Sequence, residues 1–124
     1  MVGRTARGFT LVELLVVLSI IALLLSLAVP RYFQHIERSK AAVLRENLAT
    51  LRDALDQYHA DKERWPDSLE TQARDHYLRA VPTDPLTARG DTWVTVASEE
   101  GSGVRDVKSG APGEGADGKP YAEW

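Results

Sequence analysis

The 124-residue chain contains no cysteine. Disulfide bridges and thiolate metal ligands are therefore excluded, although small domains outside the cytoplasm often depend on them for stability. The fold must be held by packing, by a bound ion or by neighbouring molecules in an assembly. The length of the chain allows one domain.

The sequence also lacks the motifs of enzyme active sites. It holds no activated-nucleophile motif, phosphate-binding loop or dinucleotide fingerprint. Its three histidines stand alone, at spacings that suit no zinc site: His35, His59 and His76. We therefore expect a protein that is not an enzyme, with no catalytic and no cofactor-binding residues.

Beyond the first eight residues, basic side chains are outnumbered by acidic ones. The chain has 15 Lys and Arg residues against 18 Asp and Glu residues, a formal net charge of −3. Without Arg4 and Arg7, 13 basic and 18 acidic residues would remain, a net charge of −5. A nucleic-acid-binding surface needs the opposite balance, so we expect no contact with nucleic acid.

What the sequence does have is one long apolar segment, Phe9–Pro30, in which Glu13 is the only charged residue. As a helix its 22 residues would extend about 33 Å, close to the ~30 Å hydrocarbon core of a membrane. Arg4 and Arg7 precede the segment, so its N-terminal end should stay in the cytoplasm. The pattern predicts a single-pass transmembrane helix, and the rest of the chain should lie on the outer side.

Glu13 is the unusual residue of this segment, because a carboxylate in lipid is costly and by default marks a function. Positions 7–13 read RGFTLVE. This string closely resembles the cleavage and methylation site of type IV prepilins and type II secretion pseudopilins. The resemblance implies that prepilin peptidase cuts after Gly8 and that Phe9 becomes an N-methylated terminus. It also implies an assembly role for Glu13, as the partner of the terminal amine of an adjacent subunit.

Three other interpretations of the segment stay open. The first is a secretory signal peptide cut after Ala28, although Glu13 would weaken its apolar region. The second is an uncleaved anchor on a monomeric binding module. In the third, Glu13 has no role in assembly and only reaches back to the membrane surface, one helical turn away.

Helix-forming residues continue to Lys62, and from position 44 apolar residues recur at steps of four, three, four and three: Leu44, Leu48, Leu51, Leu55 and Tyr58. The pattern predicts an amphipathic stalk helix whose apolar stripe packs under a small sheet. Pro30 lies where the apolar segment and the stalk join. A proline inside a helix removes one hydrogen bond and usually bends the helix, so we expect a kink at Pro30. A plain break of the helix is the alternative.

The sequence of the C-terminal half predicts short helices and strands. A short helix capped by Asp67 should run to about Asp75. The segments Thr92–Ala97 and Gly103–Lys108 should pair as an antiparallel hairpin. The expected fold class is α+β, a pilin fold in which a long N-terminal helix packs on a small antiparallel sheet. The expected organisation is a leader (1–8), a transmembrane or filament-core segment (9–30), a stalk helix (31–64) and a small periplasmic domain (65–124).

Within these families, the C-terminal half most resembles the major, G-type pseudopilins. The similar features are Trp65-Pro66 after the helix, the string YLRAVPTDP at 77–85, and a closing Asp-Gly-x-Pro followed by Trp124. The absence of cysteine argues against the adhesive pilins that close their last loop with a disulfide. The segment Pro120–Trp124 carries two aromatic residues and should be docked rather than frayed.

In the G-type pseudopilins the last loop holds calcium, and Asp117 matches one ligand position. Glu114, Glu123 and backbone carbonyls could supply further oxygens. Calcium takes six to eight oxygen ligands, however, and the acidic run expected before the final tryptophan is missing. A calcium ion is therefore one expectation, and a solvated loop anchored by its aromatic residues is the other.

The resemblance implies a structural subunit of a type II secretion pseudopilus. Such a subunit enters the inner membrane, where lipid surrounds its apolar segment, with its C-terminal domain in the periplasm. It then polymerises with other copies and related pseudopilins, on an inner-membrane assembly platform, into a filament that helps to move folded proteins out of the periplasm. A minor pilin of a type IV or DNA-uptake pilus is the alternative in the same class.

Overall fold

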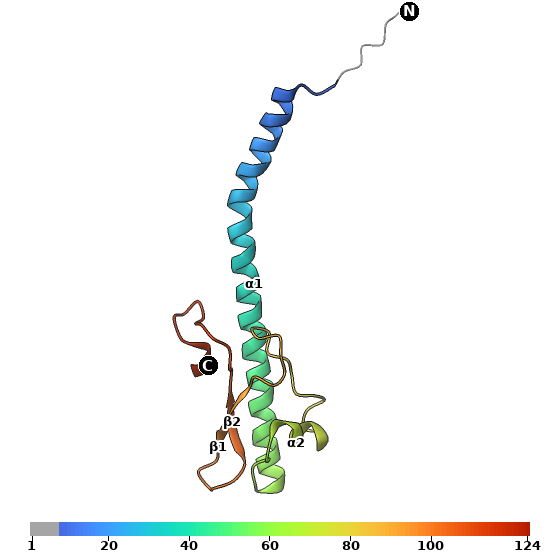
Figure 1. Ribbon diagram of the computed structural model, residues 1–124. Coiled ribbons are helices and arrows are strands. Elements are labelled where there is room, and N and C mark those ends of the chain that lie inside the picture. Colours follow the sequence, from blue (N-terminus) through green and yellow to red (C-terminus); the bar gives the residue numbers. More distant parts are fainter. Residues whose placement is uncertain (1–7) are drawn as a thin grey trace, which may run out of the picture. The chain divides into compact units, whose positions relative to one another are not determined.

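The computed structural model describes residues 8–124 (Figure 1). In chain order the elements are α1 (Leu11–Lys62), α2 (Leu69–Arg74), β1 (Val94–Ala97), β2 (Val104–Lys108) and a 3-10 turn, η1 (Tyr121–Glu123). The chain forms two compact units, one ending at Ile36 and the other running from Glu37 to Trp124. One long helix and a two-stranded antiparallel sheet make this an α+β pilin fold, as expected from the sequence.

The first unit is the apolar part of α1. Its most apolar 18-residue window has a mean hydropathy of 2.8 and no buried residue, so this helix is long and apolar enough to cross a membrane. The two serines in it bond to their own helix: Ser19 Oγ donates to the carbonyl of Leu15 and Ser26 Oγ to that of Leu23, both at 2.7 Å. Neither hydroxyl therefore needs a further partner in an apolar environment.

Pro30 lies inside α1, and the helix continues through it. The alternative of a plain helix break at Pro30 is therefore wrong. A proline can remain in a helix because only one backbone hydrogen bond is lost, and the helical turns on either side hold the segment. The bend expected at Pro30 remains a prediction.

The second unit has its core along the predicted apolar stripe of α1. All five residues of the stripe are buried, and Leu44, Leu51 and Leu55 are completely inaccessible to solvent. The side chains that cover them come from α2, from the segment between α2 and β1, and from β2: Leu69, Leu78, Trp93, Val104 and Val107. Burying one large apolar side chain is worth roughly 1.5–3 kcal/mol, so this cluster is the main source of stability of the unit.

The hairpin covers part of this core. Strands β1 and β2 pair antiparallel, with Val94 opposite Lys108, and the register shifts between Val96 and Ala97. The predicted hairpin is confirmed, but β1 begins two residues later than expected. The preceding Trp93 is buried in the core instead and donates its indole N–H to the carbonyl of Pro82 at 2.7 Å.

The helix cap predicted at Asp67 is wrong, because Ser68 caps α2. Ser68 has an extended backbone, with φ −155° and ψ 169°, and its Oγ accepts the backbone N–H of Thr71 at 3.3 Å. The helix begins one residue later than a cap at Asp67 requires, since Leu69 is buried in the core and opens the helix there.

Asp84 is a completely buried carboxylate that ties two loops together. Its Oδ1 accepts the N–H of Leu86 at 2.8 Å, and its Oδ2 accepts the hydroxyl of Ser109 at 2.7 Å. Ser109 Oγ in turn accepts the N–H of Ala111 at 3.1 Å. This chain of bonds fixes the end of β2, and thereby the start of the C-terminal loop, on the segment that precedes the hairpin.

Candidate processing and assembly site

The bond between Gly8 and Phe9 lies in the first described residues, in a non-helical stretch that ends where α1 begins. Phe9 is 85% exposed, and a β-carbon added at Gly8 would meet no atom within 4 Å. An exposed bond in an irregular segment is accessible to a peptidase, because no secondary structure has to open first. The rest of the expected leader, residues 1–7, lies outside the described residues.

Thr10 starts the helix. Its side-chain oxygen accepts the N–H of Glu13 at 3.1 Å, and its carbonyl accepts the N–H of Leu14 at 3.1 Å. Thr10 is thus the N-cap and Glu13 the third helical residue, the spacing of a capping box. Sequence reasoning missed this role of Thr10, although the pattern Thr-x-x-Glu before an apolar run is its usual signal.

This geometry places the Glu13 carboxylate in the first turn of α1, at the positive end of the helix dipole. The position stabilises a negative charge there. Glu13 is exposed, and the ion pairs formed among residues 8–124 do not include it. The backbone of Glu13 is therefore fixed in the first turn of the helix, and its exposed side chain remains accessible to another molecule.

Large apolar side chains surround this carboxylate on the surface of α1. Phe9, Leu11, Val12, Leu14 and Leu15 are each at least half exposed. A helix that is apolar on all sides is stable only when lipid or other protein covers it. Glu13 thus lies in a surface that has to be covered.

The carboxylates expected as calcium ligands do not gather into one group. Among residues 8–124 there is no group of three or more His, Cys, Asp or Glu side chains that could hold a metal. Asp117 Oδ1 accepts the N–H of Lys119 at 3.1 Å, and its Oδ2 lies 3.7 Å from Nη2 of Arg45. These residues do not fit a cation that requires six to eight oxygens.

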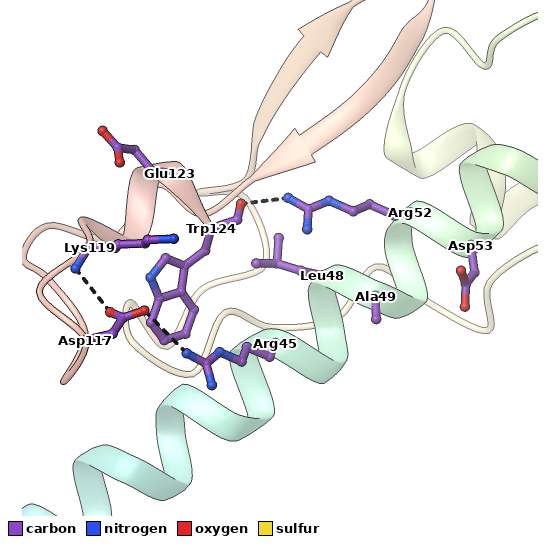
Figure 2. A pocket seen from close by; sticks show the side chains of 9 residues that line it. All are labelled: Arg45, Leu48, Ala49, Arg52, Asp53, Asp117, Lys119, Glu123 and Trp124. Atoms are coloured by element: carbon purple, nitrogen blue, oxygen red, sulfur yellow. Dashed lines mark hydrogen bonds and ion pairs between the residues drawn. The ribbon is translucent and has the colours of Figure 1, made fainter.

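Asp117 instead borders a pocket of about 480 Å³ between α1 and the C-terminal segment (Figure 2). Figure 2 shows Arg45 and Arg52 extending from the helix toward Trp124, with Leu48 between them. Neither arginine was singled out from the sequence, and these contacts were not predicted. The remaining lining residues are Ala49, Asp53, Lys119 and Glu123.

Known proteins match the N-terminal segment of this chain and also most of its length. Residues 3–29 match the family model described as the prokaryotic N-terminal methylation motif. The chain is 35% identical over 95 residues to type II secretion system core protein G of Klebsiella pneumoniae. The aligned region covers 64% of this chain and 68% of that protein. The protein of the same name from Escherichia coli K12 is 30% identical over 122 residues, 86% of this chain and 81% of the relative.

Pilins are also similar. The type IV major pilin PilA of Myxococcus xanthus is 38% identical over 61 residues, but these are 49% of this chain and only 28% of the pilin. No solved structure matches the chain. The long matches to core protein G, together with the methylation motif, the capped Glu13 and the pilin fold, identify the family: the chain belongs to the G-type pseudopilins, the family of type II secretion system core protein G.

Proposed function

We propose that this protein is a structural subunit of a type II secretion pseudopilus that helps to move folded proteins out of the periplasm. The observation that carries the proposal is the N-terminal site: an exposed Gly8–Phe9 bond, the Thr10 cap and the Glu13 carboxylate, all within an uncovered apolar surface. The assignment to a type II secretion system is supported by the similarity of the chain to relatives named core protein G of that system.

The membrane is the first environment of this surface. In the proposed topology α1 crosses the inner membrane with its N-terminus in the cytoplasm, where prepilin peptidase reaches the Gly8–Phe9 bond. Arg4 and Arg7 support this orientation through their charge. The second unit, from Glu37 onward, then folds in the periplasm.

Cleavage produces the partner that Glu13 needs. A free amine appears on Phe9, one residue before the helix cap, where the positive end of the helix dipole disfavours a second positive charge. The carboxylate of Glu13 on an adjacent subunit can neutralise this amine inside the apolar filament core. A charge in such surroundings is tolerated when it is paired, so the pair selects one axial register between neighbouring subunits.

No step of this function requires catalysis by the chain itself. Its partners are prepilin peptidase, other copies of the chain, related pseudopilins and an inner-membrane assembly platform that would drive subunit addition. A minor pilin of a type IV or DNA-uptake pilus would use the same N-terminal site, as the match to a type IV pilin over 61 residues illustrates. The matches of 30% identity or more to core protein G, over 95 and 122 residues, support the secretion system.

Processing is tested by intact mass and N-terminal sequencing of the native protein. We expect a chain that starts at an N-methylated Phe9. A start at Val29 would mean a signal peptide, and a retained Met1 would mean an uncleaved anchor; either result refutes the proposal.

Assembly is tested with Glu13→Gln, which removes the charge but keeps the size of the side chain. In cells that carry the other pseudopilus components, we expect normal cleavage but at least tenfold less of the variant in sedimented filaments, as a lost buried ion pair of more than about 1.4 kcal/mol predicts. Glu37→Gln, on the same helix outside the apolar segment, is the matched control and should assemble normally. Equal incorporation of both variants would exclude the role of Glu13.

A further inference from the structure

The C-terminal loop closes on itself through its own backbone. The N–H of Gly115 donates to the carbonyl of Lys119 at 2.9 Å, and the N–H of Gly118 donates to that of Gly115 at 3.0 Å. Asp117 Oδ1 completes the turn by accepting the N–H of Lys119 at 3.1 Å. One oxygen of Asp117 is therefore already used within the loop.

The loop is also packed against the last aromatic residue. A β-carbon at position 115 would overlap the Trp124 ring, so the glycine allows the ring to lie directly on the loop backbone. Trp124 in turn meets Tyr121 edge to face, with ring centroids 4.9 Å apart. The loop, Tyr121 and Trp124 thus form one packed unit, which we call the C-terminal clasp (residues 113–124).

Arg45 connects this clasp to the helix. Its Cζ lies 4.4 Å from the centroid of the Trp124 ring, and its Nη2 lies 3.7 Å from Asp117 Oδ2. Figure 2 shows the guanidinium beside the ring, with a dashed line that joins it to the Asp117 carboxylate. A guanidinium is charged at every physiological pH and can stack on an aromatic face while it pairs with a carboxylate. Arg45 thus brings a permanent positive charge to the free oxygen of Asp117.

Arg52 holds the clasp two helical turns further along the same side of α1. Its Nη2 donates to the main-chain oxygen of Trp124 at 2.6 Å and to that of Val107 at 3.0 Å. Its Nε donates to Asp106 Oδ1 at 2.9 Å. One arginine therefore joins the clasp, the hairpin and the helix.

We infer that Arg45 takes the place of a bound calcium ion in this pseudopilin, so that the clasp folds without calcium. Asp117 is the carboxylate expected to hold the ion, and its two oxygens are engaged by Lys119 and Arg45. A divalent cation at Asp117 would be repelled by the guanidinium. The inference concerns the fold of the monomer and does not depend on which filament the chain joins.

The test is hydrogen–deuterium exchange of the full-length chain in detergent micelles, read by mass spectrometry over residues 111–121. In the wild-type protein we expect the same exchange with millimolar calcium as with a chelator. Slower exchange in calcium that disappears in Asp117→Asn would overturn the inference, because the clasp would then contain a calcium site.

The second arm removes the proposed replacement for the ion. Arg45→Gln should speed exchange of the clasp amides about fivefold, the effect of losing an exposed cation–π contact and ion pair. Arg38→Gln is the matched control: Arg38 lies two turns before Arg45 on α1, and its side chain makes no hydrogen bond or ion pair within residues 8–124. Unchanged exchange in Arg45→Gln, or an equal change in both variants, would refute the role of Arg45.

A third variant separates a local effect from misfolding. Arg45→Lys keeps the charge but loses the planar stacking, and we expect clasp exchange between that of the wild-type protein and that of Arg45→Gln. In each variant the amides of Leu51 and Leu55 report on the core and should stay protected. If the clasp amides exchange faster only when the amides of Leu51 and Leu55 also do, the variant has unfolded generally. That result would count against the inference.

Discussion

Gly103 is a position where the structure predicts a large effect of a single added methyl group. It has a φ of +92°, and a β-carbon there would lie 2.7 Å from Cβ and 2.8 Å from the carbonyl oxygen of Trp65. The next residue, Val104, donates its N–H to the carbonyl of Pro66 at 2.8 Å. Gly103 thus lets the hairpin lie directly on the Trp65-Pro66 segment that follows α1.

The same hairpin loop contains a control. Gly101 has a φ of +100°, but a β-carbon there would meet no atom within 4 Å. Gly101→Ala therefore carries only the conformational cost of a positive φ, about 1–2 kcal/mol, partly offset by the lower entropy of the unfolded chain. Gly103→Ala adds a clash with backbone atoms that cannot rotate away, worth about 1–3 kcal/mol more.

The two variants are compared by urea unfolding of the full-length chain in detergent, followed by tryptophan fluorescence. We expect Gly103→Ala to lower the free energy of unfolding by about 2–4 kcal/mol in total, and Gly101→Ala by about 1 kcal/mol. Equal losses in the two variants would show that backbone conformation alone sets the cost. The close approach of the hairpin to Trp65 would then be wrong.

Three further predictions test the core and its polar links. Leu55→Ala should cost about 2–5 kcal/mol of unfolding free energy in the same assay, because Leu55 is completely buried. Asp84→Ala should cost about 2–4 kcal/mol, since it leaves the buried hydroxyl of Ser109 and the partly buried N–H of Leu86 without their acceptor; a loss below 1 kcal/mol would contradict this. The hydroxyl of Tyr77 donates to Asp61 at 2.8 Å, and this hydrogen bond, followed by desolvation, raises the pKa of Tyr77 above its ordinary value of 10.0. Its contribution to stability is therefore fully present below about pH 10 and is lost as the pH rises through the folded-state pKa. The stability gap between the wild-type protein and Tyr77→Phe should be constant from pH 7 to 9 and close above pH 10.

The helical pattern and the turn residues of the sequence were enough to predict most of the fold. The apolar steps from Leu44 to Tyr58 identified the buried stripe, because a helix turns the same side to the core at these spacings. The hairpin followed from its β-rich segments. The cap of α2 was predicted one residue too early, since Asp67 and Ser68 are both good capping residues and the burial of Leu69 decides between them.

Local contacts of the N-terminal site can also be read from sequence. Thr10 caps a helix in which Glu13 is three residues away, and this spacing is visible without a structure. What a sequence cannot show is which subunit would meet Glu13 in the proposed filament, because that contact would not be made within the chain. The same limit applies to every large apolar side chain near it.

The contacts of the C-terminal clasp could not be predicted from the sequence for a different reason. The partners of Arg52 are 54 to 72 residues away in the chain, and the pairing depends on how the C-terminal segment is laid along α1. In the sequence, Arg45 and Arg52 are two of many charged residues outside the apolar stripe. Their seven-residue spacing places both on one flank of that stripe, next to the same buried Leu48. A search for positive charges on the flanks of a buried stripe, made opposite the position of an expected metal ligand such as Asp117, would identify further chains in which the proposed replacement of the ion by an arginine can be tested.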